Sequence, residues 1–128
     1  MRISAWIIIA ATLSMAASST GWSDPISVQL SKGGAQYAST CARCHGPALG
    51  GAWGPPLKGE TFLQEWNQQT ARKLYSRILT TMPASAPGTL SPRTVLNLTL
   101  YILSQNGVRL GSKERTSPNQ LNAVTIGR

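Results

Sequence analysis

The sequence is poor in metal ligands and in acidic groups. Its 128 residues contain two cysteines, one histidine and four acidic residues, against twelve lysines and arginines. Two cysteines are too few for a disulfide framework, and two cysteines with one histidine fall one ligand short of a tetrahedral zinc site. The formal net charge of +8 favours acidic partners. Nucleic acid is not expected among them, because none of the usual binding motifs is present.

Long apolar runs are also scarce, and the run near the start is short. Residues 5–13 are apolar, follow Arg2 and precede the small residues 17–19. This pattern is typical of a secretory signal peptide, and the run is too short to cross a bilayer comfortably. We predict a signal peptide over residues 1–23, cleaved between about residues 19 and 23, and a periplasmic protein with no membrane span after cleavage. The alternative is a leader retained as a membrane anchor.

Both cysteines and the histidine lie together in the stretch CARCH, residues 41–45. A disulfide between Cys41 and Cys44 would close only a tiny loop and would restrain the unfolded chain little. A thioredoxin-like redox pair expects alternating strands and helices, which the sequence does not show. The spacing is instead that of c-type haem attachment, in which Cys41 and Cys44 form thioethers with the porphyrin and His45 binds the iron.

Met82 is the candidate for the sixth iron ligand. Met1 and Met15 fall within the predicted signal peptide, so Met82 is the last methionine left in the mature chain. It precedes Pro83 in a segment that prolines stiffen. A lone methionine is ordinarily core filling, but beside a haem motif its thioether is the available soft ligand. Iron held by His45 and Met82 has no open position, which favours an electron carrier over an enzyme.

Apolar spacing and start signals predict an all-α fold without strands. Ser91 and Pro92 mark the clearest start, because serine is a good N-cap and proline suits the first helical position. Thr70 is predicted to cap another helix. The expected helices cover residues 26–42, 61–67, 71–81 and 92–106.

Gly33 and Gly34 lie inside the first expected helix and need a reason, since each costs about 1 kcal/mol relative to alanine. We expect the last helix to cross the first one there, with Tyr37 and Tyr101 close to the contact. The alternative is a turn followed by a shorter helix that starts at Ala35.

The segments outside these helices carry fewer signals. Residues 107–128 are mostly polar and are predicted to be an extension laid over the surface, with a short apolar group at Leu121, Val124 and Ile126 and a helical turn after Pro118. In the irregular segment after the CARCH stretch, the rigid Pro55 is expected to offer its carbonyl to His45. Trp53 and Trp66 are candidates to enclose the cofactor edge, with simple core packing as the alternative.

The sequence resembles class I monohaem cytochromes c over the whole predicted mature chain. This resemblance implies a small all-helical fold with crossed N- and C-terminal helices around one covalently bound haem c, His45 and Met82 as axial ligands, and a cytochrome c domain over residues 24–106 followed by the extension 107–128. The motifs that carry it are Gly34 and Tyr37, Cys41-Ala42-Arg43-Cys44-His45-Gly46, Gly54-Pro55-Pro56-Leu57, Thr81-Met82-Pro83 and Leu100-Tyr101-Ile102-Leu103.

A narrower similarity links the sequence to cytochromes that accompany pyrroloquinoline-quinone (PQQ) alcohol dehydrogenases. It rests on residues 62–66 (FLQEW), residues 80–91 and Asn106-Gly107. It implies a periplasmic carrier that takes electrons from a quinoprotein dehydrogenase and passes them toward a terminal oxidase. The alternatives are a tightly bound cytochrome subunit of a larger oxidoreductase, and a haem enzyme or gas sensor.

The positive charge points to an acidic redox partner. Loss of Arg2 with the leader leaves eleven basic and four acidic residues, or +7, and two haem propionates would lower this to about +5. Arg43, Arg72, Lys73 and Arg77 are the candidates for a cationic rim around the exposed haem edge, which would steer such a partner. The alternative is charge that only keeps the protein soluble.

Overall fold

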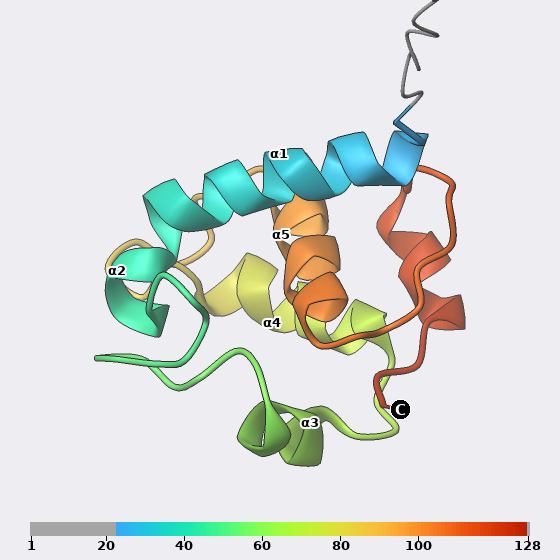
Figure 1. The fold of residues 1–128 in the computed structure, drawn as a ribbon. Helices are drawn as coiled ribbons and strands as arrows, with labels where there is room; N and C mark the ends of the chain where they lie inside the picture. Colours follow the sequence, from blue (N-terminus) through green and yellow to red (C-terminus); the bar gives the residue numbers. More distant parts are fainter. Residues whose placement is uncertain (1–22, 128) are drawn as a thin grey trace, which may run out of the picture.

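Residues 23–127 are described by a computed structural model, and within them the chain is helical (Figure 1). Residues 1–22 of the predicted signal peptide lie outside the described residues. In the described part, β pairing is limited to an isolated bridge between Thr70 and Thr125, so the predicted all-α fold is confirmed. The elements are α1 (Pro25–Thr40), α2 (Ala42–His45), α3 (Glu60–Trp66), α4 (Ala71–Thr81), α5 (Pro92–Gln105) and the 3₁₀-helix η1 (Pro118–Ala123).

Helices α1 and α5 cross, as Figure 1 shows, and Gly33 lies at their contact. A β-carbon on Gly33 would meet the Asn97 carbonyl oxygen and lie 2.8 Å from the Tyr101 Cβ. The rings of Tyr37 and Tyr101 lie beside the crossing with centroids 5.6 Å apart. The predicted crossing is thus confirmed, and because α1 is continuous, a separate helix starting at Ala35 is excluded.

The starts of α4 and α5 are stabilised differently. Ser91 caps α5 by accepting a hydrogen bond from the Thr94 backbone N–H at 3.1 Å. Thr70 occupies the N-cap of α4, but its side chain makes no capping hydrogen bond, so that part of the prediction was wrong. The Ala71 N–H instead donates to the Val124 carbonyl at 2.8 Å. The C-terminal segment therefore satisfies one of the N–H groups at the start of α4 that have no partner within the helix.

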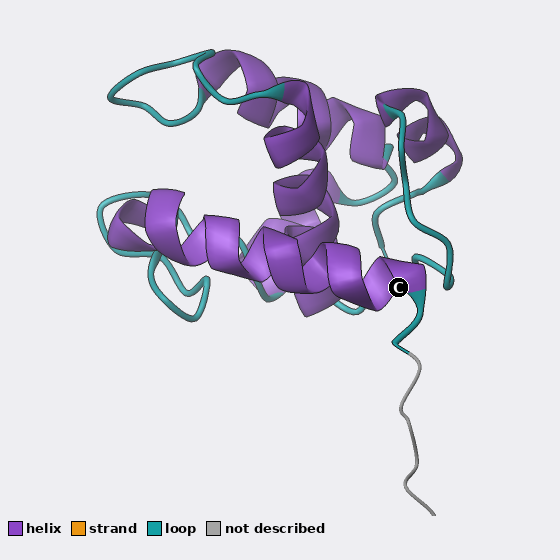
Figure 2. Cartoon of the chain, turned by 90° about the horizontal axis from the view of Figure 1, so that it is seen from above, coloured by secondary structure: helices purple, strands orange, loops and turns teal. Residues whose placement is uncertain are grey.

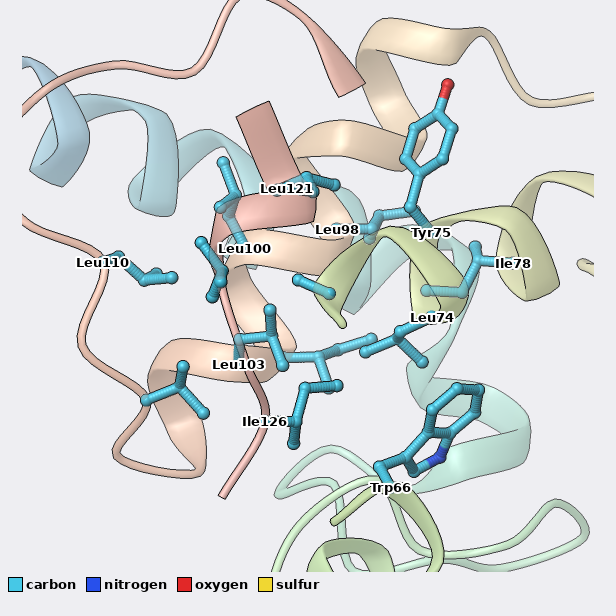
Figure 3. Packing of buried hydrophobic residues seen from close by; sticks show 14 of the residues in the cluster. Trp66, Leu74, Tyr75, Ile78, Leu98, Leu100, Leu103, Leu110, Leu121 and Ile126 are labelled. Atoms are coloured by element: carbon cyan, nitrogen blue, oxygen red, sulfur yellow. The ribbon is translucent and has the colours of Figure 1, made fainter. Parts of the chain in front are cut away.

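The segment after α5 contributes to the core rather than only covering it. Leu121 and Ile126 are fully buried, and Figure 3 shows them among side chains of α4 and α5 such as Leu74 and Leu103. The expectation of a tail laid over the surface therefore understates its role, because its short apolar group packs between the helices. The predicted helical turn after Pro118 is η1. The division of the chain at residues 106 and 107 stays a prediction.

Two loops lie at the same end of the molecule (Figures 1 and 2). One is the α2–α3 loop, residues 46–59, and the other is the α4–α5 loop, residues 82–91. Both contribute residues to the wall of one cavity. The helices thus place the motifs that were far apart in the sequence around a common space.

Candidate functional site

A cavity of about 550 Å³ lies between the two loops and the helices. Its wall includes all four predicted site residues, namely Cys41, Cys44, His45 and Met82. Most of the other lining side chains are apolar, and they come from α3, α4, α5 and both loops. Cofactor sites typically enclose about 300–1,000 Å³ and have such linings, so the cavity suits a flat apolar cofactor with a metal.

The short helix α2 presents the two cysteines. The N–H groups of Cys44 and His45 both donate to the Cys41 carbonyl, at 3.1 and 2.9 Å, which winds the motif into one turn. Gly46 ends this turn with a φ of 85°, a conformation that suits glycine. Both cysteines are free thiols that line the cavity, Cys41 half-buried and Cys44 exposed. They are therefore accessible to the same edge of a bound group.

The electrostatic surroundings of Cys41 keep its thiol protonated before any cofactor is attached. Burial, with a smaller contribution from Cys44, raises the pKa of Cys41 from 9.0 to about 11. A buried thiolate is disfavoured because the charge loses its hydration. Attachment of this sulfur to a porphyrin as a thioether removes the ionisable proton altogether.

The imidazole of His45 is held in one orientation. Its Nδ1 lies 2.8 Å from the Pro55 carbonyl oxygen, and because a carbonyl can only accept, Nδ1 carries the proton. The neutral ring then has its lone pair on Nε2, the atom available to bind a metal. The ring also packs against Gly54, where a β-carbon would lie 2.9 Å from Cε1. The hydrogen bond to Pro55 was expected from the sequence, whereas the contact with Gly54 was not.

Asn106, at the end of α5, holds the α2–α3 loop. Its side chain accepts from the Gly59 N–H at 3.0 Å and donates to the carbonyls of Leu57 and Ile102, both at 2.9 Å. Asn106 is 9% exposed, so these bonds are largely shielded from water. The sequence marked Asn106 as the end of a helix and as part of the narrower resemblance, and nothing in the local pattern indicated partners 47 and 49 residues earlier.

Tyr37 fixes the residue that follows His45. Its hydroxyl donates to the Gly46 carbonyl at 2.6 Å, and the side chain is 1% exposed. Burial raises the pKa of Tyr37 from 10.0 to about 12, with smaller contributions from Cys41 and Tyr101. The sequence placed Tyr37 at the helix crossing but did not predict this hydrogen bond.

Met82 lies at the C-terminal end of α4. Its N–H donates to the Ile78 carbonyl at 3.0 Å, so the last turn of the helix fixes the backbone from which the side chain starts. Pro83 follows and cannot continue the hydrogen-bond ladder. Met82 is half-buried and lines the cavity with Ile78 and Leu74 of the same helix.

The two tryptophans named from the sequence both line the cavity, but they differ in exposure. Trp66 is 9% exposed and packs against Phe62, with ring centroids 6.2 Å apart. Trp53 is 94% exposed at the opening. Trp66 therefore belongs to both the core and the cavity wall, whereas Trp53 lines the cavity without being part of the core.

The basic residues proposed as a rim lie in different surroundings. Arg43 and Lys73 are exposed, and the exposed Arg77 lines the cavity together with Glu65. Arg72 is partly engaged, since it lies 5.3 Å from the Tyr75 ring centroid and donates to Asn119 at 3.1 Å. Among the described contacts, Arg43, Lys73 and Arg77 have no comparable partners. The rim stays a prediction.

Among residues 23–127, no helix is both long and apolar enough to span a membrane. In the same range, no group of three or more histidine, cysteine or acidic side chains is arranged to hold a metal ion.

Comparison with known proteins agrees with the geometry. Residues 28–102 match the family described as cytochrome c oxidase, cbb3-type, subunit III. No curated protein matches the chain. A chain of the sulfane dehydrogenase SoxCD from Paracoccus pantotrophus has a similar fold, with a TM-score of 0.59 and 20% sequence identity over 76% of this chain.

The alignment covers 52% of that SoxCD chain, so this protein spans about half its length. At this identity the likeness concerns the fold alone. The family match covers more than half of the sequence and includes the CARCH stretch and Met82. The chain therefore belongs to the cytochrome c family of the cbb3-type oxidase subunit III, and its cofactor is covalently bound haem c.

Proposed function

We propose that this cytochrome is a periplasmic electron carrier whose haem iron is bound by His45 and Met82. The observation that supports this most directly is that Met82 lines the same largely apolar cavity as Cys41, Cys44 and His45, although it lies far from them in the sequence. Haem c supplies a one-electron ferric/ferrous couple when bound.

The side chains around the cavity perform separate tasks in this proposal. Cys41 and Cys44 hold the cofactor, which prevents its loss outside the cell. His45 presents Nε2 toward the metal, because the hydrogen bond from its Nδ1–H to the Pro55 carbonyl fixes the orientation and the tautomer of the ring. Met82 supplies a thioether, which favours the reduced iron and raises the reduction potential. Two side-chain ligands leave no position for a substrate, so the site is suited to electron transfer.

The route of the electrons is the finer part of the proposal. Residues 1–23 would direct the chain to the periplasm, where residues 24–106 would carry the haem. The resemblance of residues 62–66 and 80–91 to cytochromes of quinoprotein alcohol dehydrogenases supports a PQQ-dependent dehydrogenase as donor. A terminal oxidase or another cytochrome would then accept the electrons.

A second candidate is a tightly bound subunit of a larger oxidoreductase. The matched family is described as a subunit of an oxidase, and the alignment covers only 52% of the similar chain from a sulfane dehydrogenase, which is therefore the longer of the two. Copurification with a partner at high salt would favour this candidate over a free carrier. A haem enzyme or gas sensor is a third candidate, and it requires Met82 to leave the iron.

The test is spectroscopic. The chain is expressed with its leader in a host that has haem-attachment machinery, and spectra of the oxidised and reduced periplasmic protein are recorded. We expect a low-spin haem c spectrum, a near-infrared sulfur-to-iron band and no reaction of the reduced protein with carbon monoxide at neutral pH. A colourless product would contradict the haem assignment.

Met82→Ala provides the matched comparison. Loss of the thioether should abolish the near-infrared band, open the iron to carbon monoxide and lower the reduction potential. Carbon monoxide binding to the wild-type protein would instead support the sensor or enzyme candidate.

A further inference from the structure

Trp53 is an unusual side chain in this structure. It is 94% exposed, whereas the other exposed large apolar residue of the described chain, Val28 on α1, is 46% exposed. Single apolar residues on a surface are ordinary, so exposure alone does not indicate a binding role for Trp53. Its position at the cavity does.

Trp53 lies at the opening of the cavity. It lines the cavity from the α2–α3 loop, which projects from the helices in Figure 1. Cys44 lines the same cavity and is itself exposed, so a group held by this cysteine would lie beside the open side of the cavity. A protein that docks over Trp53 would therefore approach the part of the site nearest to solvent.

Most of the two loops around the opening is uncharged, and several basic residues lie beside the uncharged parts. Residues 46–57 and 82–91 contain no charged side chain, and residues 84–89 of the second loop are all exposed. Arg43 and Lys58 flank residues 46–57, the exposed Glu60 follows Lys58, and the exposed Arg77 lines the cavity. Glu65 is the acidic residue among those lining it. A weakly polar centre with charged residues at its edge is the usual anatomy of a protein interface.

We propose that Trp53 is the central anchor of a docking surface for an acidic redox protein. The surface consists of Trp53 and the α4–α5 loop, with Arg43, Lys58 and Arg77 at its edge. The partner would offer an apolar depression for the indole, surrounded by aspartate and glutamate. Tryptophan and arginine are enriched among the residues that dominate binding free energy, and opposite charges speed association. This inference rests on the proposed electron-carrier function.

Two other occupants suit the surface less well. A second copy of the holoprotein carries the same positive charge, about +5 after loss of the leader and with two haem propionates, and would be repelled. An anionic membrane would attract the charge, but a single indole gives weak anchoring, and bilayer contact would cover the opening through which electrons leave.

The test compares two oxidants of the reduced holoprotein in stopped-flow experiments at low ionic strength. Plastocyanin, an acidic copper protein, is the protein probe, and one electron passes from ferrous haem to Cu(II), which becomes Cu(I). Hexacyanoferrate(III) is the small probe, because it takes one electron without a protein interface. Wild type is compared with Trp53→Ala and with Val28→Ala, which removes the other exposed apolar side chain far from the cavity.

We expect Trp53→Ala to lower the second-order rate constant with plastocyanin about tenfold, the effect of one strong interface residue. Val28→Ala should stay within about twofold of wild type, as should every variant with hexacyanoferrate(III). An unchanged plastocyanin rate in Trp53→Ala would overturn the docking role. Equal losses with both oxidants would also overturn it, because Trp53 would then act on the haem itself.

Two further outcomes separate the alternatives. The holoprotein could bind phosphatidylglycerol vesicles and lose this binding in Trp53→Ala while the plastocyanin rate stays unchanged. That result would assign Trp53 to a membrane and contradict the proposal. A wild-type dimer that dissociates only in Trp53→Ala would contradict it as well. A wild-type holoprotein that reduces neither oxidant would contradict the carrier function itself, which distinguishes that failure from a failure of the docking surface.

Discussion

The Nδ1 atom of His45 lies 2.8 Å from the carbonyl oxygen of Pro55, and Gly54 packs against the same ring. The Gly54 N–H also donates to the Cys44 carbonyl at 2.7 Å, so the loop returns directly onto the motif that carries the histidine. These contacts between protein atoms set the orientation and the tautomer of the imidazole independently of any metal. The geometry of the proposed iron ligand thus depends on a loop that contributes no ligand.

Gly54→Ala should disturb this arrangement directly. The new β-carbon would lie 2.9 Å from Cε1 and 3.0 Å from Nδ1 of His45, so the ring or the loop must move. We expect a loss of about 1–3 kcal/mol in the free energy of unfolding, as for other overpacked sites, together with a shifted reduction potential.

Gly50→Ala is the control in the same loop, because a β-carbon there has no atom within 4 Å. Guanidinium unfolding and redox titration of both variants provide the measurements. Similar stability and potential for the two variants would contradict the role given to Gly54.

Asn106→Ala should loosen the loop from the side of α5. The substitution leaves the Gly59 N–H and the Leu57 carbonyl without their partner, and each buried unpaired group costs about 1–3 kcal/mol. We expect the variant to be about 2 kcal/mol or more less stable than wild type in guanidinium unfolding. Asn119→Ala is the control, since Asn119 is exposed and accepts only from Arg72 among the described contacts.

If Asn106 had a structural role alone, its substitution would change stability without changing the reduction potential of the haem iron. Because the loop also holds Pro55 against His45, the reduction potential of Asn106→Ala should shift as well, whereas that of Asn119→Ala should not. An unchanged potential in Asn106→Ala would restrict Asn106 to folding.

The helix crossing predicts different effects for two adjacent glycines. In Gly33→Ala the new β-carbon would meet the Asn97 backbone and the Tyr101 Cβ, neither of which can move without separating α1 from α5. In Gly34→Ala it would contact the Tyr101 ring at 3.1 Å, and a ring can rotate slightly. The better helix propensity of alanine, about 1 kcal/mol, offsets part of that cost.

We therefore expect Gly33→Ala to lose about 1–3 kcal/mol of unfolding free energy and Gly34→Ala to lose clearly less. Thermal unfolding of the two variants side by side is the measurement. Equal destabilisation would mean that the crossing is looser than the structure indicates.

The sequence predicted what depends on local chemistry and failed where partners are distant. The Cys-x-x-Cys-His spacing, the start of α5 at Ser91 and the crossing at the glycine pair all follow from residues within one or two turns. The stabilisation of the start of α4 does not follow from nearby residues, because the Ala71 N–H donates to the carbonyl of the distant Val124. Asn106 was missed for the same reason.

The C-terminal segment gives the clearest measure of that limit. Leu121 and Ile126 belong to a short apolar group in a polar stretch, and their burial depends on tertiary packing that no periodicity reveals. Leu121→Ala should cost about 2–5 kcal/mol of unfolding free energy, as expected for a fully buried leucine. Val28→Ala, at a 46% exposed position, should change it by about 0.5 kcal/mol or less. A cost near zero for Leu121→Ala would restore the prediction of a tail that only covers the surface.

Tyr37 makes the stability of the protein depend on pH in the alkaline range. Because burial raises the pKa of Tyr37 from 10.0 to about 12, the phenol of the unfolded chain loses its proton at a lower pH than the folded one. Its contribution is fully present below pH 10 and is lost as the pH rises toward about 12. Tyr37→Phe has no such proton and leaves the Gly46 carbonyl without its donor, so it should be about 1–3 kcal/mol less stable than wild type at neutral pH. Guanidinium unfolding of both proteins between neutral pH and about pH 11.5 is the measurement, and the difference in their free energies of unfolding should shrink above pH 10. A difference that stays constant over this range would contradict the assignment to Tyr37.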